Sequence, residues 1–199
     1  MNVLVIYAHP SHRCFTHEVL ERFVAGLEDA GHRAIVADLH AEGFDPVMTP
    51  EEYARESRGS RNTPVPDDIA REHARLMAAD AVAFVFPLWW SDCPGLLKGW
   101  FDRVYTVGRA YDHSTGAPSG FGIGKGLALC TAGHTEEDLR ATGIVASLEA
   151  VILHDRMTNV GIGQPELVLL AGTAGCTDPE HFERLRARAY AAGRDLAST

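Results

Sequence analysis

AVAFVFPLWWSDCPGLLKGWFDRV, residues 81–104, runs from an uncharged apolar segment through a short loop into a segment with helical spacing. The apolar segment Ala81–Phe86 lacks the alternation of a half-exposed strand and is typical of a strand buried on both faces. Gly95–Val104 has the apolar spacing of a helix. A buried strand followed by a helix indicates a parallel sheet covered by helices.

The same strand-to-helix pattern repeats along the whole chain. Five apolar runs are predicted as strands: Val3–Tyr7, Arg33–Asp38, Ala81–Phe86, Gly126–Thr131 and Glu166–Leu170. Five longer segments are predicted as helices: Phe15–Ala30, Asp67–Ala79, Gly95–Val104, Thr142–Asp155 and Asp178–Ala197. Right-handed crossovers place helices on both faces, which predicts an open, doubly wound α/β fold with three αβα layers. Five strands favour the flavodoxin-like order 2-1-3-4-5 over the six-stranded dinucleotide-binding order.

Chain length and one proline-bearing segment set the expected domain organisation. At 199 residues the chain is long enough for one hydrophobic core, so we expect a single domain over residues 1–199. Residues 41–66 are polar and contain several prolines. They are predicted to form a surface excursion with a short helix at Pro50–Glu56.

Composition limits the class of partner. The chain is 46% hydrophobic and 23% charged, which is typical of globular proteins, and no run approaches the roughly twenty apolar residues of a membrane span. A net charge of −9 argues against nucleic acid or an anionic membrane as partner. No basic leader precedes the first predicted strand, and the four cysteines lie far apart without a CxxC pair. We therefore expect a cytoplasmic protein with reduced thiols, no membrane insertion, and small molecules or other proteins as partners.

Ligands of a doubly wound sheet bind beyond the carboxyl ends of its strands, where the strand order reverses. Three loops are predicted to lie there: residues 8–16, 87–95 and 132–138. Each follows a predicted strand and leads into a polar or helical segment. We expect these loops to form the binding site.

The first loop, AHPSHRCFT, carries two hydroxyl residues and three side chains that can be cationic: Ser11, Thr16, His9, His12 and Arg13. Because a helix N-terminus offers free N–H groups and a partial positive charge, this loop is a candidate phosphate site. Equally open from the residues alone is a polar loop in which Thr16 only caps the helix. The imidazoles have no paired carboxylate in the loop, so we expect no metal site.

The middle loop places Trp89 and Trp90 where the buried strand has stopped. Successive side chains of an extended segment point to opposite sides, so both rings cannot enter the same core. Leaving one indole ring in water forgoes about 4–6 kcal/mol, taking about 25 cal/mol per Å². We expect the rings to be covered by the 41–66 excursion, by a second subunit or by a planar ligand.

The third loop begins with two small residues, Ala132 and Gly133, that allow backbone to approach a ligand closely. The following Thr135-Glu136-Glu137-Asp138 resembles a capping box, so an ordinary strand-to-helix turn is the alternative. The glycine-rich stretch GFGIGKG, residues 120–126, has neither dinucleotide-loop nor P-loop spacing and is interpreted as a turn.

FPLWWSDCPGLLKGWFDRVY, residues 86–105, followed by GRAY, closely resembles the signature of the NAD(P)H:quinone oxidoreductase family, FPL-x-W-x-x-x-PA-x-LKGW-[FI]-[DE]-RV. AHPSHRCFT resembles the AH-x-x-x-x-SFN phosphate loop of that family. FDPVMT resembles its FNP-[VI]-[IM] segment, and LCTAGH resembles its TTGG flavin loop. These matches occur in the same order and cover residues 2 to about 135.

The resemblance implies a flavin site built from all three loops. The flavin phosphate and ribityl region would be held by His9, Arg13, Cys14, Phe15 and Thr16. The ring system would be flanked by Pro87, Leu88, Trp89 and Trp90, with Trp90 at the tryptophan that the family retains. Backbone N–H groups facing the flavin N1/O2 edge, where reduction builds negative charge, would come from Thr131, Ala132 and Gly133.

The resemblance also implies two catalytic residues. Tyr111 matches a tyrosine that reaches the substrate pocket across a dimer interface, so a homodimer is expected. The downstream Tyr and His of well-known quinone reductases are absent from DLRATGIVAS, and His134 is the nearest substitute as proton donor. The chain departs from the family where Cys14 replaces Ser, Thr16 replaces Asn and Ala132 replaces the first glycine of TTGG.

The function implied by the resemblance is that of a flavodoxin-like flavoenzyme. It would take hydride from NAD(P)H onto a bound flavin and reduce a quinone or similar aromatic acceptor by two electrons in a ping-pong cycle. FAD is the expected flavin and FMN the alternative. The competing hypothesis is a flavin-binding electron carrier or regulatory protein, such as an accessory subunit of a potassium-efflux transporter.

Overall fold

Five parallel strands form the centre of the computed structural model, which describes residues 1–60, 62–112 and 120–196. The strands are β1 (Asn2–Tyr7), β2 (Arg33–Asp38), β3 (Ala81–Pro87), β4 (Lys125–Thr131) and β5 (Pro165–Leu170). Their order in the sheet is β2-β1-β3-β4-β5. The predicted fold class and strand order are therefore confirmed.

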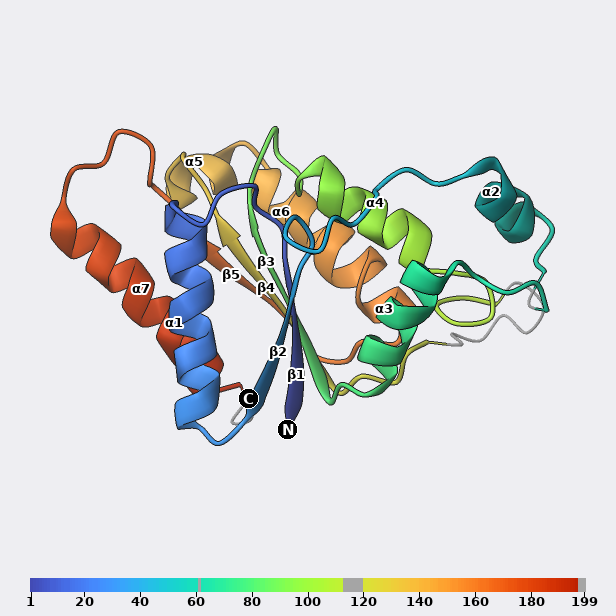
Figure 1. The fold of residues 1–199 in the computed structure, drawn as a ribbon. Coiled ribbons are helices and arrows are strands. Elements are labelled where there is room, and N and C mark those ends of the chain that lie inside the picture. The colour runs from blue at the N-terminus through green and yellow to red at the C-terminus, as the bar shows by residue number, and fades with distance from the viewer. Residues whose placement is uncertain (61, 113–119, 197–199) are drawn as a thin grey trace.

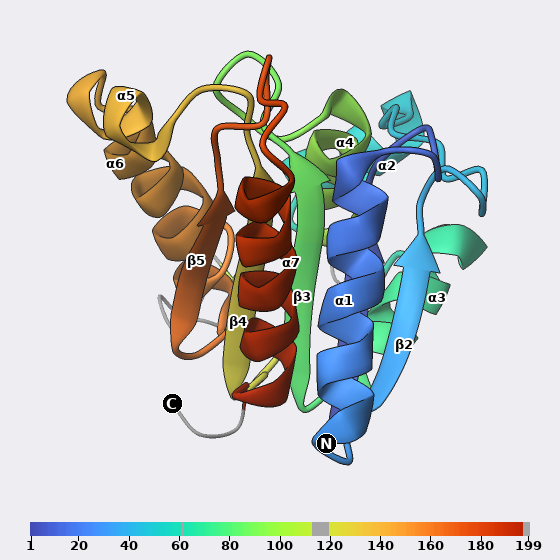
Figure 2. The same ribbon diagram turned by 90° about the vertical axis from the view of Figure 1, so that its left-hand side faces the viewer.

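Helices cover both faces of the sheet (Figures 1 and 2). One face carries α1 (Phe15–Asp29) and α7 (Pro179–Arg194). The other carries α3 (Asp67–Met77), α4 (Gly95–Val104), α6 (Ile144–Leu148) and the π-helix η1 (Glu149–Asp155). None of the helices in the described ranges has the length and apolarity needed to span a membrane.

Alternation along the strands separates two cores. Val5 and Tyr7 of β1 pack with Phe23 of α1, whereas Leu4 and Ile6 belong to the core on the opposite face. Because successive strand residues point to opposite faces, a strand buried on both sides must be apolar throughout. This is the physical reason for the uncharged run in β3, where every residue is buried.

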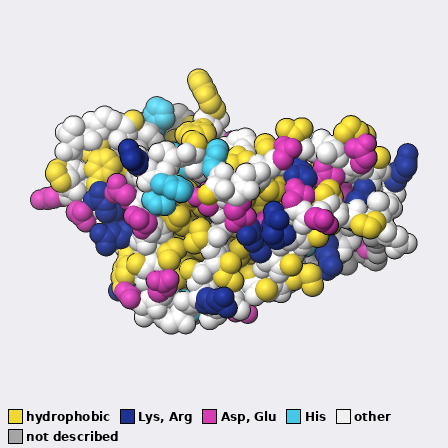
Figure 3. Space-filling view, in the orientation of Figure 1, with side chains coloured by type: hydrophobic (Ala, Val, Ile, Leu, Met, Phe, Trp, Pro, Cys, Tyr) yellow, Lys and Arg dark blue, Asp and Glu magenta, His cyan; other side chains and the backbone are white. Residues whose placement is uncertain are grey.

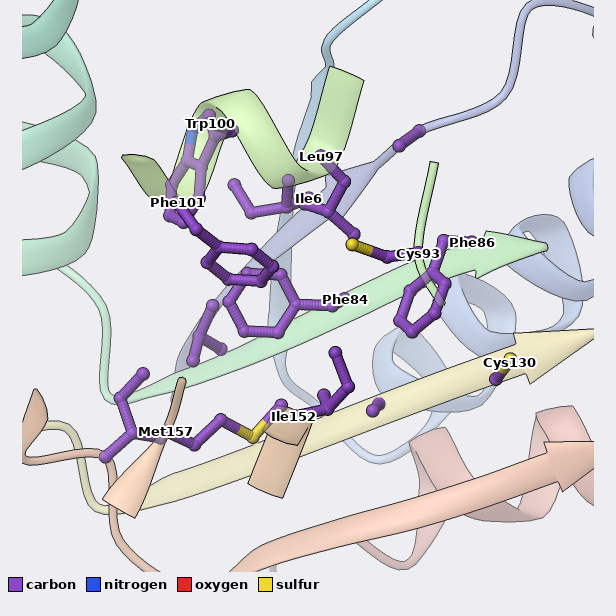
Figure 4. Close-up of a cluster of buried hydrophobic side chains, with 14 of the residues drawn as sticks. Ile6, Phe84, Phe86, Cys93, Leu97, Trp100, Phe101, Cys130, Ile152 and Met157 are labelled. Carbon is purple, nitrogen blue, oxygen red and sulfur yellow. The ribbon is translucent and has the colours of Figure 1, made fainter. Parts of the chain in front are cut away.

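Aromatic side chains fix α4 against the sheet (Figure 4). The rings of Trp100 and Phe101 on α4 lie 5.7 and 5.1 Å from the ring of Phe84 on β3. The buried indole N–H of Trp100 donates to Glu72 Oε2 of α3 at 3.0 Å. The LKGW part of the sequence is therefore a packing helix, and its start sets where the preceding loop ends.

The 41–66 segment leaves β2 and carries α2 (Pro50–Ser57), which Figure 1 shows beyond α4. A capping box formed by Thr49 and Glu52 begins this helix. Glu52 also accepts a hydrogen bond at 2.9 Å from Nε of the buried Arg103 on α4. Arg103 Nη1 donates to the carbonyl oxygen of Asp45 at 2.6 Å, so α4 fixes the excursion by its backbone as well as by α2.

One predicted helix, Thr142–Asp155, differs in the structure. A short helix α5 (Glu136–Ala141) comes first, and the next helix begins only after Gly143, whose φ of +77° is the left-handed conformation that separates the two. The chain then changes from α6 to π-helical bonding in η1 and ends in the short 3₁₀-helix η2 (Thr158–Val160). At the C-terminus α7 ends at Arg194, earlier than predicted, and Ala197 lies outside the described residues.

Gly99 is the contact point between α4 and the excursion. A Cβ atom added there would overlap the side chain and carbonyl oxygen of Pro46. Gly95, one turn earlier on the same helix, has nothing within 4 Å of an added Cβ. The glycine of LKGW therefore permits a close approach of the FDP segment.

Replacing Gly99 by Ala is expected to lower the free energy of unfolding by about 1–3 kcal/mol, because the backbone at Pro46 must move. The matched Gly95→Ala variant should be neutral or stabilising, since alanine is the better helix former by about 1 kcal/mol. Urea unfolding of both variants measures the difference. Equal stabilities for the two variants would show that Pro46 does not press on α4.

Candidate active site

The three predicted loops meet at the carboxyl edge of the sheet. Hydrogen bonds join the strand ends: the N–H of Ala8 donates to Val85 O at 3.1 Å, and the N–H of Leu88 donates to Thr131 O at 2.7 Å. The hydroxyls of Thr16 and Thr131, both buried, share a 2.8 Å hydrogen bond. Helix α1 and strand β4 are thereby held together directly beneath the first and third loops.

The first loop closes on itself between β1 and α1. His9 Nδ1 lies 3.0 Å from the Ser11 backbone N–H and 3.2 Å from Cys14 Sγ. Cys14 is the N-cap of α1, but its side chain makes no capping hydrogen bond. Thr16 does not cap the helix either, since its hydroxyl is bonded to Thr131. The alternative that Thr16 merely caps α1 is therefore wrong.

The N-terminus of α1 is suited to bind an anion. Within the described residues no protein acceptor is recorded for the backbone N–H groups of Phe15 and Thr16. The exposed Arg13 lies just before them, and the buried Nδ1 of His17 also lacks a partner there. Figure 3 shows histidine side chains gathered on this face. Free donors, helix polarity and a neighbouring cation together fit a phosphate group.

The histidines of this region have separate partners. His9 contacts Ser11 and Cys14, and His12 Nε2 lies 2.6 Å from Asp38 Oδ2 on β2. The rings of His12 and His17 are stacked with centroids 4.7 Å apart. In the described part of the chain no group of three or more potential ligands is arranged to hold a metal ion.

Trp89 and Trp90 lie on a tight turn in the second loop. The N–H of Trp89 donates to Asp92 O at 3.0 Å, and the N–H of Asp92 returns to Trp89 O at 3.2 Å. Trp90 and Ser91 between them have φ angles of +50° and +65°. Such two-residue turns normally use Asn-Gly, and residues other than glycine held in this region cost about 1–3 kcal/mol each.

The strained turn exposes both indole rings. Trp90 is fully exposed at 101% and Trp89 is 44% exposed, with its ring centroid 5.7 Å from that of His9. The described residues of the 41–66 excursion therefore do not cover Trp90. A solvent-exposed aromatic ring on a strained backbone turn at a binding edge indicates that a ligand or a partner covers the ring.

The third loop is paired with the loop after β5. The N–H of Ala132 donates to Leu170 O, and Ala132 O accepts from Thr173 N, both at 3.1 Å. The carbonyl of the exposed His134 accepts from Gly172 N at 2.7 Å. For the backbone N–H groups of Gly133 and His134 no acceptor is recorded among the described residues, so these two, rather than that of Ala132, can face a ligand.

Tyr111 lies away from these loops, against α2. Its hydroxyl donates to Glu56 Oε2 at 2.8 Å, and the same oxygen accepts from Val107 N at 2.7 Å. Burial and this hydrogen bond raise the pKa of Tyr111 to about 12. Within a single chain, Tyr111 therefore lies apart from the turn formed by residues 89–92.

Two groups that shape the site cannot be identified from the sequence. Tyr7, at the end of β1, donates from its hydroxyl to Ser11 O at 3.3 Å and so braces the first loop. The free N–H of His134 has no sequence signal either, because the residue type indicates only what the imidazole can do. A buried tyrosine in an apolar strand gives no signal that distinguishes bracing from packing.

Comparison with known proteins agrees with this geometry. Residues 1–192 match a family described by its flavodoxin-like fold. An uncharacterized NAD(P)H oxidoreductase of Haemophilus influenzae is 31% identical over 171 residues, which cover 85% of this chain and 83% of that protein. The NAD(P)H:quinone oxidoreductase structure from Methanothermobacter marburgensis is 45% identical with a TM-score of 0.94, covering 99% of this chain and 97% of that one.

A more distant structure shares the fold alone. The FMN-dependent NADH-azoreductase from Bacillus anthracis, solved in complex with FMN, has a TM-score of 0.74 and is 18% identical, with coverage of 99% of this chain and 100% of that one. The fold and site thus define a flavodoxin-like oxidoreductase. The chain belongs to the NAD(P)H:quinone oxidoreductase family.

Replacing Ser91 by Gly is expected to raise the free energy of unfolding by about 1 kcal/mol, because glycine adopts a φ of +65° without the steric cost that serine has. Ser147→Gly, inside α6, should instead lower it by about 0.5 kcal/mol. Thermal unfolding compares the two variants. A Ser91→Gly variant less stable than the parent would contradict a strained turn.

Proposed function

We propose that this oxidoreductase uses a bound flavin to carry reducing equivalents from NAD(P)H to a quinone or a similar aromatic acceptor. The observation that carries the proposal is the exposed, strained Trp90 turn, which lies at the same sheet edge as the free N–H groups at the start of α1. A flat aromatic ring system attached to a phosphate would satisfy both features at once. The names of the Haemophilus influenzae relative and of the Methanothermobacter marburgensis structure support the same reaction class.

The first loop and α1 would hold the phosphate end of the flavin. The donors would be the N–H groups of Phe15 and Thr16 and the Arg13 guanidinium, with His9 and Cys14 closing the loop. Helix α1 has 15 residues, and the N-terminus of such a helix, with a cation nearby, is a suitable phosphate site. The Thr16 hydroxyl would not contact the flavin directly, because it is buried against Thr131.

The second and third loops would surround the ring system. Pro87 and Leu88 would lie at its edge, Trp89 and Trp90 would cover its face, and the N–H groups of Gly133 and His134 would face its pyrimidine edge. A bound flavin would supply two-electron redox chemistry, because it accepts reducing equivalents from NAD(P)H and passes them to the acceptor. Donors fixed at the pyrimidine edge favour the extra negative charge of the reduced ring.

The bound flavin would be either FAD or FMN. The functional form would be a homodimer. The sequence resemblance favours FAD, whereas the name of the azoreductase neighbour supports FMN. A second copy of the chain would cover the indole rings on the side away from the flavin and could bring Tyr111 to the acceptor. Sedimentation of the flavin-loaded protein tests the dimer, and a monomer at all concentrations would contradict it.

The purified protein is expected to be yellow and to release FAD or FMN on heating. It should oxidise NADH or NADPH over many turnovers only when a quinone is supplied. Trp90→Ala should weaken flavin binding about tenfold, a loss of about 1.4 kcal/mol, because ring contact is removed. Met77→Ala, at an exposed position at the end of α3, is the control. A wild-type protein that binds neither flavin would overturn the proposed function.

His134 is proposed as the proton donor during acceptor reduction, because its exposed imidazole lies on the third loop. His134→Gln should lower turnover about 100-fold while flavin content and reduction by NAD(P)H stay the same. His40→Gln, an exposed histidine after β2, is the control. Stopped-flow measurement of the two half-reactions decides the matter, and an unchanged reaction with the acceptor would exclude His134.

A further inference from the structure

Asp92 joins the Trp turn to the body of the protein. Its backbone closes the turn in both directions with Trp89, as described above. Its carboxylate forms a two-pronged ion pair with Arg156: Nη1 to Oδ1 at 3.1 Å and Nη2 to Oδ2 at 3.2 Å. The same carboxylate accepts from the backbone N–H of Cys93 at 2.7 Å. Both oxygens of Asp92 are therefore used to orient the end of the turn.

Arg156 is a rigid anchor for this contact. Its guanidinium is buried, lies 5.1 Å from the centroid of the Phe101 ring and donates to Cys93 Sγ at 3.2 Å. Its carbonyl oxygen accepts from the Tyr105 hydroxyl at 2.8 Å. Figure 4 places Cys93 and Phe101 in the same buried cluster. A guanidinium packed in this way has little freedom, so the orientation of Asp92 is fixed as well.

The backbone directly before Arg156 has an unusual, π-helical conformation. The π-helix η1 covers Glu149–Asp155 and ends directly before Arg156. The N–H of Arg156 donates to Val151 O at 3.0 Å, five residues earlier, where an α-helix would use the fourth. π-helical turns are rare and occur frequently at functional sites. Here the wider turn shifts the register of the helix just where Arg156 enters the core.

The ion pair differs from a contact that only joins two buried elements. Arg156 is buried, but the Asp92 side chain is 47% exposed and belongs to a loop at the binding edge. A buried guanidinium needs a partner, and the partner used is the residue that closes the strained turn. Strained residues persist only where their surroundings over-determine them, and the Asp92–Arg156 pair supplies that constraint.

We infer that Arg156 is a positioning residue, which acts through Asp92 to hold the Trp89–Asp92 turn so that the Trp90 ring is preset for the flavin. This role rests on the proposed function. Arg156 itself would not touch the flavin. It reduces the conformational freedom that Trp90 would otherwise lose on binding, so its contribution is measured in flavin affinity.

The test compares three variants in the full-length protein freed of flavin: Arg156→Met, Asp92→Asn and the double variant. Amide exchange at Trp89 and Asp92, measured by NMR, reports on the turn without any flavin. Titration with FMN and with FAD then gives the dissociation constants. We expect each single variant to accelerate exchange at both amides at least tenfold and to weaken flavin binding about tenfold. The double variant should be no worse than either single one, because the two residues act through one contact.

Two further variants separate positioning from general stability. Arg156→Lys keeps the charge but not the two-pronged geometry, so it should restore only part of the affinity. Arg194→Met removes another two-pronged ion pair, in which the exposed Arg194 at the end of α7 contacts Asp195 at 2.8 and 3.0 Å. It should leave both amide exchange rates and both flavin constants unchanged.

The outcomes distinguish this inference from the proposed function. A wild type that binds neither flavin overturns the proposed function. A wild type that binds flavin, with Asp92→Asn and Arg156→Met binding it equally well, overturns the positioning role alone, even where amide exchange has become faster. Should Arg156→Met fail to fold, as circular dichroism would reveal, Asp92→Asn decides by itself, because its side chain is half-exposed and its substitution is isosteric.

Discussion

Helix α4 is held by polar groups that are buried together, and the binding edge depends on where this helix starts. The Trp100 indole donates to Glu72, which also accepts from Arg75 at 2.7 Å. About one turn further along the helix, Arg103 is paired with the buried Glu52. Buried charges stabilise a structure only when their partners are well placed, so these contacts allow α4 a single position. The loop before α4, with its two tryptophans, can therefore begin and end at only one place on the sheet.

Local pattern was sufficient to predict the fold. The bounds predicted for β2 and α4 agree with the structure, and those of β1 and β3 differ by one residue. The strand runs are short and mostly apolar, and segments with helical spacing separate them, so each of these signals arises within one segment. The placement of the Trp pair at the carboxyl edge followed from the fold alone, because parallel strands of a doubly wound sheet all end at the same edge.

Contacts between distant segments could not be predicted in the same way. The Thr16–Thr131 hydrogen bond spans 115 residues and the Asp92–Arg156 pair spans 64. Each of these side chains has an ordinary local interpretation: Thr16 as a helix cap, Asp92 as an acidic loop residue and Arg156 as a basic residue near a helix end. The left-handed conformation of Gly143 was missed for a similar reason, since a glycine within a periodic segment does not reveal its φ angle.

The middle loop combines three features that a stable fold does not need: two residues with positive φ, a fully exposed tryptophan and a buried guanidinium committed to a loop carboxylate. An Asn-Gly turn with a small polar side chain would join β3 to α4 without strain. Natural sequences depart from local preference mainly at functional sites, where strain is part of the mechanism. Two of these departures occur at Trp90 and Ser91, and Arg156 contacts the same turn through Asp92. All three share one geometric result, which is a flat ring held at the sheet edge. A ligand with a flat ring system gives all three a common cause, whereas packing explains none of them.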